Sequence, residues 1–333
     1  MDGFAKTLLP RVDLARFPTP IEDAPRLAAA VGCAALRVKR EDLAGAAFGG
    51  NKLRQIELIL GDAKAQGADL LVATAAAQSN FCRALAGSAA RVGLGCTLLL
   101  RGKPDAPRVG NLLLDHVFGA AIEFTDIADP WDPAIRARLG GIAAAASAKG
   151  RKPMVVQLTG DTAALAVAAW AQGADEVLEQ GGGSATHMVV ACGSALTLAG
   201  LALGFKHRGK GPRLVGVSVQ QPPSRLRPWI VDVAARGAAC LGIPTGLGDA
   251  DFDLLDMTGP GYGVPSPESV AAVRLAGRLQ GLVLDPVYSG KAMAVLVAAL
   301  ADGRIPAHGD ILFQHSGGAP GLFVHAQAFA GAT

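Results

Sequence analysis

Cysteine is scarce in this chain, and its placement excludes two kinds of structural support. The five cysteines are widely spaced and include no CxxC pair. The six histidines form no HxH or HExxH pattern, so the usual spacing of zinc ligands is missing. We therefore expect neither a disulfide framework nor a metal site, and we expect reduced thiols in a cytoplasmic protein.

A surplus of charge is also missing. The 31 basic and 28 acidic residues leave a formal net charge of +3, and no lysine- or arginine-rich run stands out. Nucleic-acid and anionic-membrane surfaces need such clusters, so we expect neither partner. The N-terminal stretch MDGFAKTLLPRVDLARFP lacks a long apolar core, which argues against a signal peptide. Glycine, serine and threonine interrupt the uncharged run 188–205, which we interpret as a buried strand, a turn and a buried helix rather than a membrane span.

Aromatic residues are few, whereas alanine and the 43 glycines supply much of the bulk. The length of 333 residues suggests about two domains of about 150 residues each. Short β-branched runs alternate with alanine-rich helical patterns, which predicts an α/β fold with mainly parallel sheets. We predict strands at 69–75, 96–100, 153–158, 186–191, 213–219, 282–285 and 310–315. We predict helices at 53–66, 80–92, 163–180, 196–207, 228–241, 267–280 and 289–301.

Polar residues follow several of the predicted strands, where open parallel sheets bind their ligands. Ser79 and Asn80 are good N-cap residues, so helix capping alone is the simpler interpretation of this pair. The turn at 192–200 has free N–H groups at a helix start, which suit phosphate, but neither GxGxxG nor GxxxxGK[ST] occurs. The full set that follows the strands is Gln78–Asn80, Gly193–Ser194, Gln220–Gln221 and His315–Gly318.

Three further residues stand in unusual contexts. The only two tyrosines, Tyr262 in GPGYGVP and Tyr288 in LDPVYSGK, lie in glycine- and proline-bounded turns rather than inside core elements. Two phenols in turns favour a site that needs O–H groups for orientation or proton transfer. Lys52 follows two glycines and Asn51 at a predicted helix start. For this motif alone, a solvent-facing lysine at a helix start is the default interpretation, and a reactive lysine is the alternative.

Seven motifs in order between residues 16 and 323 together resemble the D-cysteine desulfhydrase and 1-aminocyclopropane-1-carboxylate deaminase family. They are RFPTPIEDAPRL, VKREDLAGAAFGGNKLRQIE, AQSNFCRALAGSAARVGL, GSALTLAGLALG, GPGYGVPSPES, LDPVYSGKAMA and ILFQHSGGAPGLF. The resemblance implies a pyridoxal 5'-phosphate enzyme with a tryptophan-synthase-β-like fold (fold type II), in which helices flank two open, twisted, mainly parallel sheets. It also implies a homodimer and a cofactor in the cleft between two domains. The larger, cofactor-binding domain would comprise residues 1–48 and 162–333, and the smaller α/β domain residues 49–161.

The resemblance also implies a role for individual residues. Lys52 would form the Schiff base with the cofactor and, once freed by a small amino-acid substrate, would remove its α-proton. Asn51 would begin the lysine's helix, Asn80 would contact the ring hydroxyl, and Ser79 would lie near the substrate carboxylate. The remaining residues implied at the site are Cys192, Gly193, Ser194, Ala195, Leu196 and Thr197 around the phosphate, Tyr262 and Tyr288 beside the substrate, and Ser316 with Ser289 near the pyridine nitrogen.

The sequence departs from the family pattern at three positions. Phe81 stands where a histidine or glutamine is usual, so a polar group near the carboxylate or cofactor is lost. Leu196 replaces a glycine of the phosphate loop, which predicts strain if that position has a positive φ. Asp161 adds a negative charge to a normally glycine-rich stretch, so we expect it to point away from the phosphate or to meet a different group of the substrate.

The expected reaction is β-elimination of D-cysteine, in which the thiol leaves and the aminoacrylate is hydrolysed to pyruvate and ammonia. Deaminases of the family carry glutamate where this chain has Ser289, which disfavours cyclopropane opening. Elimination of sulfite from L-cysteate is a related alternative. A non-catalytic binding protein with a degraded site is an alternative of another class, and a nicotinamide-dependent dehydrogenase lacks its glycine fingerprint.

Overall fold

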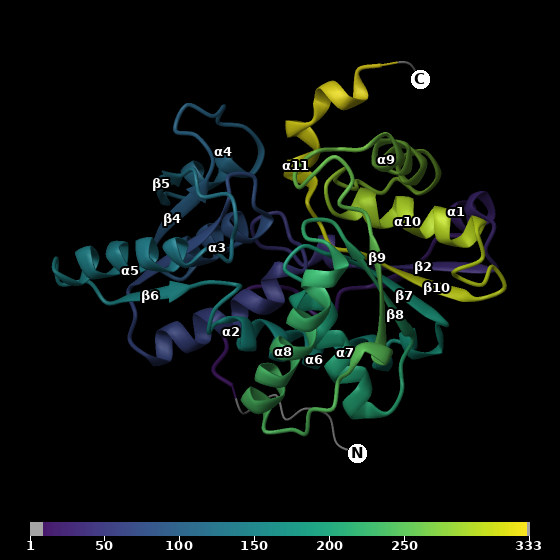
Figure 1. Cartoon of the computed structure of the whole chain (residues 1–333), viewed down its shortest axis with the longest axis horizontal. Helices are drawn as coiled ribbons and strands as arrows, with labels where there is room; N and C mark the ends of the chain where they lie inside the picture. The colour runs from purple at the N-terminus through teal and green to yellow at the C-terminus, as the bar shows by residue number, and fades with distance from the viewer. Residues whose placement is uncertain (1–8, 332–333) are drawn as a thin grey trace.

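Two separate sheets form the frame of the molecule (Figure 1). The computed structural model describes residues 9–331. Two sequence predictions fall partly outside that range. One concerns the N-terminal segment, for which no signal peptide is expected, and the other is the start of the predicted larger domain. Within residues 9–331, no helix is long and apolar enough to cross a membrane.

The larger sheet has the strand order β1-β2-β10-β7-β8-β9. β1 is antiparallel to β2, and the other neighbours are parallel. The strands are β1 (Ile21–Asp23), β2 (Ala35–Arg40), β7 (His187–Cys192), β8 (Arg213–Ser218), β9 (Phe252–Asp256) and β10 (Asp310–His315). This register sets the carboxyl ends of β7, β8 and β10 at one edge of the sheet.

Helices cover both faces of the larger sheet. In β7, Met188 and Val190 pack in the core with α6 (Ala163–Glu179), α7 (Leu196–Arg208) and α8 (Pro223–Leu241). The alternate residues Val189 and Ala191 pack in the core with α1 (Pro25–Val31), α9 (Pro267–Gln280) and α10 (Ser289–Ala301). Because both faces are buried, β7 is apolar along its length instead of alternating between apolar and polar residues.

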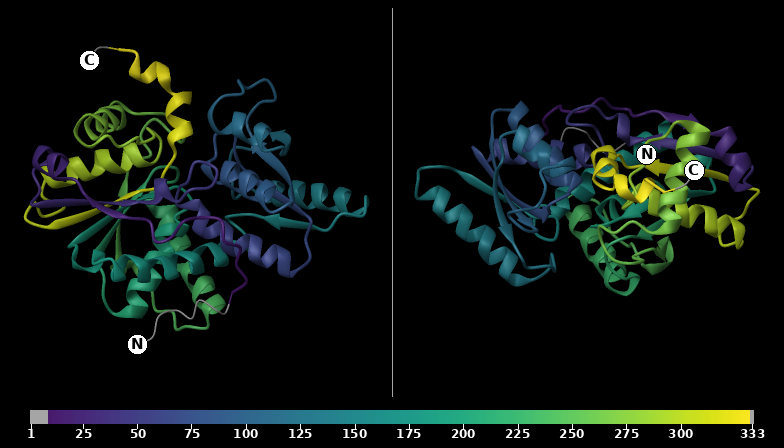
Figure 2. Two further views of the ribbon diagram at one scale, coloured as in Figure 1. Left: turned by 180° about the vertical axis from the view of Figure 1, so that it is seen from behind. Right: turned by 90° about the horizontal axis from the view of Figure 1, so that it is seen from above.

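The smaller sheet is parallel throughout, with the order β5-β4-β3-β6. Its strands are β3 (Leu70–Ala76), β4 (Gly95–Arg101), β5 (Ala121–Thr125) and β6 (Pro153–Val156). Its helices are α2 (Lys52–Ala65), α3 (Asn80–Arg91) and α4 (Gly110–Val117) in one core, and α5 (Pro133–Ser147) in the other. The short α11 (Ala319–Val324) returns from the larger sheet to contact α4. Figure 2 shows the two parts beside each other from behind and from above.

The fold expected from the sequence, two mainly parallel sheets flanked by helices, is confirmed. One predicted strand is wrong, because residues 282–285 form no strand. Leu282 and Leu284 bury their side chains in the core beside α9 and α10 while the chain crosses from one helix to the next. α8 begins at Pro223 rather than at residue 228, because the earlier proline also suits a first helical turn.

Each sheet takes its strands from separate stretches of the chain. The smaller sheet uses residues 70–156, and the larger uses 21–40 and 187–315. On this grouping we propose the two domains stated above, with the chain crossing between them twice.

Candidate active site

A cavity that opens to solvent lies at the carboxyl ends of strands from both sheets. The smaller sheet contributes residues at or just beyond the ends of β3, β4 and β6, and the larger sheet contributes residues beyond β7, β8 and β10. Six of the polar or glycine residues predicted beyond the strands line it, namely Ser79, Asn80, Gly193, Ser194, Gln220 and Ser316. These six residues therefore meet at one cavity, and their role in binding a ligand stays a prediction.

Lys52 lines the cavity as the first residue of α2. The turn before it needs glycine, since a Cβ on Gly49 would lie 2.2 Å from the carbonyl oxygen of Asp42. Backbone N–H groups fix this turn: Gly50 donates to the Glu41 carbonyl (2.9 Å) and Asn51 to the Ser316 carbonyl (3.0 Å). The half-buried Lys52 amine has no hydrogen-bond or ion-pair partner within residues 9–331. Desolvation lowers its pKa to about 8.

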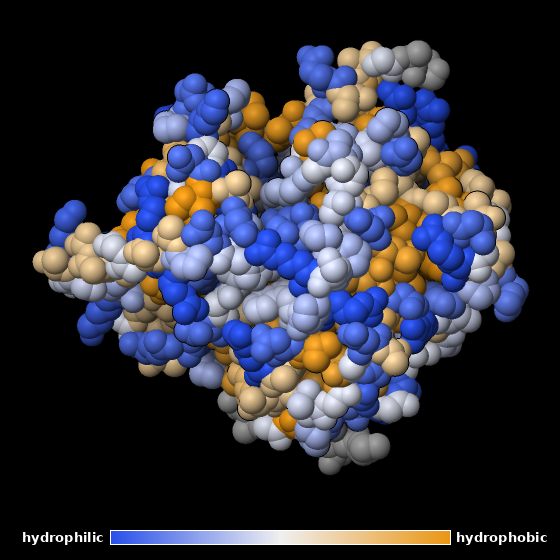
Figure 3. Space-filling view, viewed as in Figure 1, coloured by the Kyte–Doolittle hydropathy of each residue, from blue (hydrophilic) through white to orange (hydrophobic). Residues whose placement is uncertain are grey.

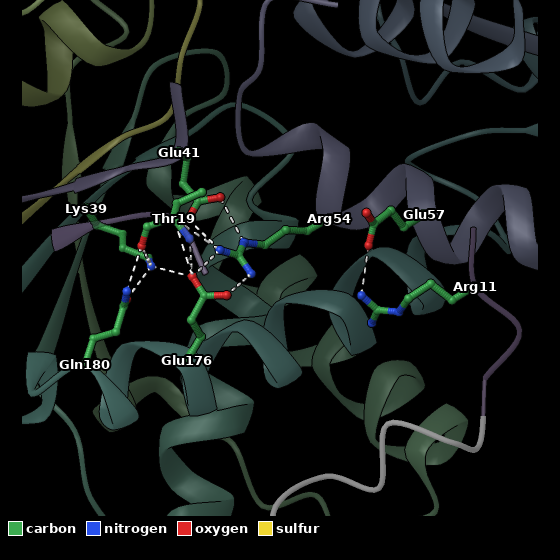
Figure 4. Close-up of polar contacts among 8 residues, drawn as sticks. All are labelled: Arg11, Thr19, Lys39, Glu41, Arg54, Glu57, Glu176 and Gln180. Atoms are coloured by element: carbon green, nitrogen blue, oxygen red, sulfur yellow. Dashed lines mark hydrogen bonds and ion pairs between the residues drawn. The ribbon is translucent and has the colours of Figure 1, made fainter. Parts of the chain in front are cut away.

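A buried ionic network anchors the same helix from its other side (Figure 4). Arg54 contacts Glu41 at 2.8 Å and Glu176 at 2.6 Å, and Lys39 also pairs with Glu176. The Thr19 hydroxyl donates to Glu41 at 2.7 Å. These residues come from the N-terminal segment, β2 and the turn after it, α2 and α6, so the network ties the lysine-bearing helix to the larger sheet.

The turn from β7 to α7 forms the opposite wall. A Cβ on Gly193 would lie 2.9 Å from the Tyr288 ring, so only glycine fits there without a shift. The Ser194 hydroxyl oxygen is buried and has no hydrogen-bond partner in the described chain. Ala195 has a left-handed backbone (φ 60°, ψ 4°) immediately before the 13-residue helix α7. An orphan hydroxyl at the N-terminus of a helix suits an anion such as phosphate.

Leu196 does not have the positive φ that would cause backbone strain. Leu196 is the first helical residue of α7 and is buried in the core, and the positive φ belongs to Ala195. Thr197 accepts a hydrogen bond from the Asn51 amide at 3.1 Å, and Cys192 is buried in the core below. Cys192, Ala195, Leu196 and Thr197 therefore support this wall without lining the cavity.

Tyr262 and Tyr288 meet at the cavity wall. Their hydroxyl oxygens are 2.5 Å apart and their rings pack edge to face with centroids 6.1 Å apart. Burial raises the pKa of both phenols, so both keep their protons at neutral pH. Ser289 does not line the cavity, because its hydroxyl donates to the Asp285 carboxylate at 2.7 Å.

The start of α3 completes the wall of the smaller sheet. The Ser79 hydroxyl accepts from the N–H groups of Phe81 and Cys82, both at 3.2 Å, so the capping interpretation is confirmed. The Asn80 side-chain oxygen accepts from Asn111 at 2.9 Å. Phe81 is 3% exposed yet lines the cavity, and the exposed Asp161 does not line it, as expected.

Two comparisons with known proteins show the family of this chain. The family model described as "Pyridoxal-phosphate dependent enzyme" matches residues 12–317. The D-cysteine desulfhydrase of Salmonella choleraesuis (strain SC-B67) is 38% identical over 328 residues, which cover 96% of this chain and 97% of that protein. The chain belongs to the pyridoxal-phosphate dependent enzyme family. Pyridoxal phosphate is the cofactor of this family.

A comparison with a solved structure supports the same family assignment at the level of the fold. The "ACC deaminase homologue" crystal structure superposes with a TM-score of 0.87 at 32% identity and covers 96% of this chain and 95% of its own. The residues of the cavity also fit such a cofactor. Lys52 offers an amine without a partner, and the orphan Ser194 hydroxyl at the start of α7 offers an anion site.

The residues that line the cavity without having been predicted from the sequence include Arg101, Trp131, Gln157 and Thr159. Arg101 ends β4 and Gln157 follows β6, so the carboxyl-end rule could have found both. Trp131 lies before α5, and its ring packs against Trp229 of α8 with centroids 6.2 Å apart. Nothing in the sequence around Trp131 marks this contact between the two parts of the molecule.

Proposed function

We propose that this protein catalyses β-elimination of a small amino acid by a D-cysteine desulfhydrase-type reaction. D-cysteine and water would give pyruvate, ammonia and hydrogen sulfide. One observation carries the proposal: the desolvated, unpaired Lys52 amine shares a cavity with the hydrogen-bonded Tyr262–Tyr288 pair. The similarity to a D-cysteine desulfhydrase over nearly the whole chain supports the same reaction.

The cavity offers a holder for each part of the cofactor. The Lys52 amine would hold it covalently as a Schiff base, and the turn with Gly193 and Ser194 would bind the phosphate. Ser316 would face the ring nitrogen, and the Asn80 amide would face the ring hydroxyl. When bound, the cofactor supplies an electron sink for the pair left at the α-carbon.

The proton transfers belong to the chain's own side chains. Once the amino group of the substrate has freed Lys52 from the cofactor, its pKa of about 8 leaves a useful fraction neutral near pH 7–8, and this amine can take the α-proton at Nζ. The phenols remain protonated in this range, so one of them can give its proton to the leaving sulfur. The bond between the β-carbon and sulfur breaks with its electron pair on sulfur, which takes up this proton and leaves as hydrogen sulfide.

A substrate panel tests this function. The cofactor-loaded enzyme would be assayed for pyruvate with D-cysteine, L-cysteate and β-chloro-D-alanine, and for 2-oxobutyrate with 1-aminocyclopropane-1-carboxylate. We expect pyruvate from β-substituted substrates and no 2-oxobutyrate, because Ser289 is turned toward Asp285. Formation of 2-oxobutyrate would favour the deaminase activity. A protein that binds no pyridoxal phosphate and turns over none of the four would be a non-catalytic relative.

We also propose a homodimer. α4 exposes Leu113 (45%) and Val117 (67%), and the adjacent α11 exposes Phe323 (72%). Figure 3 shows hydrophobic residues between these elements at the top of the view. An apolar surface of this kind is typical of a protein interface. Light scattering after size exclusion would give twice the mass of the 333-residue chain, and a monomer at micromolar concentration would contradict the proposal.

We propose a cytoplasmic location as well. All five cysteines, which lie within the described residues, are free thiols, and four of them are buried. A reducing compartment keeps such thiols intact. Fractionation of the source cells would test this, and recovery from an oxidising compartment would contradict it.

A further inference from the structure

Asn111 is a buried polar residue of α4 that does not line the active-site cavity. Its side-chain nitrogen Nδ2 donates two hydrogen bonds, one to the backbone carbonyl of Gln78 and one to the side-chain oxygen of Asn80, both at 2.9 Å. Its own side-chain oxygen has no hydrogen-bond partner in residues 9–331. An unpaired buried acceptor costs stability, so packing alone does not explain an amide at this position.

Backbone groups fix the orientation of this amide. A backbone carbonyl can only accept, so the Asn111 atom that faces the Gln78 carbonyl has to be the nitrogen. The Gln78 side chain is fixed in the same way, because its nitrogen donates to the Val109 carbonyl and its oxygen accepts from the Asn111 backbone N–H, both at 3.0 Å. A Cβ on Gly110 would lie 2.8 Å from that oxygen, so glycine lets the start of α4 come this close.

The fixed Asn111 amide decides in turn which end of the Asn80 amide is available to a ligand. Because Asn111 donates, the Asn80 atom on that side is the oxygen, and the nitrogen is at the other end. The Asn80 nitrogen has no hydrogen-bond partner within residues 9–331. Asn80 lines the cavity and Asn111 does not, so the end turned away from Asn111 is the one that a bound ligand meets. Asn80 therefore offers the cavity a hydrogen-bond donor.

We propose that Asn111 is a positioning residue, which holds the Asn80 amide so that its N–H donates to the ring oxygen of the cofactor. The inference rests on the role proposed above for Asn80 and extends it to a residue outside the cavity. A donor stabilises the ionised ring oxygen, because hydrogen bonds to charged acceptors are stronger than those to neutral ones. A reversed amide would present its own oxygen, and only a ring hydroxyl that keeps its hydrogen would fit. Asn111 thus sets the cofactor affinity and the charge of the ring oxygen.

Two substitutions of similar size at Asn111 test this in the cofactor-loaded protein. In Asn111→Asp the new side chain has at most one hydrogen, which the Gln78 carbonyl takes, so Asn80 has to turn and donate to the carboxyl group. We expect the Kd for pyridoxal phosphate to rise at least about tenfold. We expect a similar change in the absorbance ratio, from the yellow form toward the shorter-wavelength form whose ring oxygen is protonated. Asn111→Leu neither holds nor reverses the amide, so both quantities should change less than about threefold.

An isosteric change at Asn80 gives the same readout without altering the core. Asn80→Asp keeps an acceptor for Asn111 and places an oxygen toward the ligand directly, at a half-buried position. It should reproduce the absorbance shift of Asn111→Asp. An unchanged absorbance ratio in Asn80→Asp would overturn the inference, whether or not Asn111→Asp folds.

A double-mutant cycle separates positioning from a general effect on α4. The Asn80→Ala background has no amide to orient, so adding Asn111→Asp should change the Kd and the absorbance ratio less than about twofold. Leu112→Ala is the matched control, because Leu112 is 1% exposed on the same helix and its side chain has no hydrogen-bonding group. It should lower the Tm of the cofactor-free protein and leave the absorbance ratio unchanged.

Two results of this set would overturn the inference. One is an equal effect of Asn111→Asp with and without the Asn80 amide, and the other is an equal effect of Asn111→Asp and Asn111→Leu. These measurements need bound cofactor but no turnover. A protein that shows the predicted shifts and processes no substrate would therefore support the inference and refute the proposed function, whereas a protein that binds no pyridoxal phosphate would refute both.

Discussion

Arg54 should be among the most costly polar side chains to remove, although it does not line the cavity. Its side chain is 6% exposed and that of Glu41 is 0% exposed. Arg54→Met keeps an apolar stem but removes the guanidinium, which lies over the Phe17 and Trp170 rings and is the main partner of the two carboxylates. Breaking such a pair from one side costs about 3–5 kcal/mol.

The titration of Glu176 gives a second measure of the same contact. Burial by itself raises its pKa, but the hydrogen bonds and charges of Arg54 and Lys39 lower it to about 2 from the model-peptide value of 4.5. The difference corresponds to about 3 kcal/mol. Because the folded pKa is depressed, this stability is present above pH 4.5 and disappears as the pH falls toward 2. On acidification, the Arg54→Met variant should therefore begin to unfold at a higher pH than the wild-type protein.

Urea unfolding followed by circular dichroism measures the effect. A loss of about 3 kcal/mol shifts the midpoint by about 1 M at an m-value of ~3 kcal/mol/M. Arg213→Met is the matched control, because Arg213 pairs with Asp253 at 2.6 Å with both side chains over 40% exposed. Exposed pairs contribute about 0–1 kcal/mol. Equal midpoints for the two variants would refute the reasoning from burial.

Three further predictions concern the turn at the start of α7. Ala195→Gly should raise stability by about 1 kcal/mol, because glycine adopts the left-handed backbone without a Cβ penalty, and an unchanged Tm would contradict this. Leu196→Gly, which restores the usual residue of the family, should lower stability by roughly 3–5 kcal/mol in urea because it empties a core position; a gain would mean that Leu196 is strained after all. Ser194→Ala should leave the Tm of the cofactor-free protein unchanged and raise the Kd for pyridoxal phosphate about tenfold, and unaltered affinity would show that the hydroxyl is not used.

The sequence predicts the parallel core well, because the spacing of apolar residues along the chain indicates which faces of an element are buried. Strands such as β7 are apolar on both faces, and helices such as α9 have matched start and stop residues, so both are visible without tertiary information. Residues 282–285 look like a strand for the same reason, since burial against helices leaves the same apolar run as burial in a sheet. Only the tertiary structure shows that residues 282–285 have no neighbouring strand with which to pair.

The site was predictable where a strand end or a motif marks it. Lys52 and Ser194 fall at such places and reach the cavity. The condition for strain at Leu196 is not met, since a motif aligns positions but does not say which one takes the positive φ, and here it is Ala195. Trp131 was missed because its contact with Trp229 joins segments about 100 residues apart through packing alone, which no local pattern records.

The most direct test of the account is chemical, and it concerns Lys52. The protein loaded with pyridoxal phosphate would be reduced with borohydride, digested and mapped by mass spectrometry, with Lys52→Ala as the control. We predict that the reduced cofactor is attached to Lys52 alone and that loading follows a pH midpoint near 8, the pKa of the buried amine. Attachment to another lysine, or a wild-type protein that remains colourless and unmodified, would contradict the account.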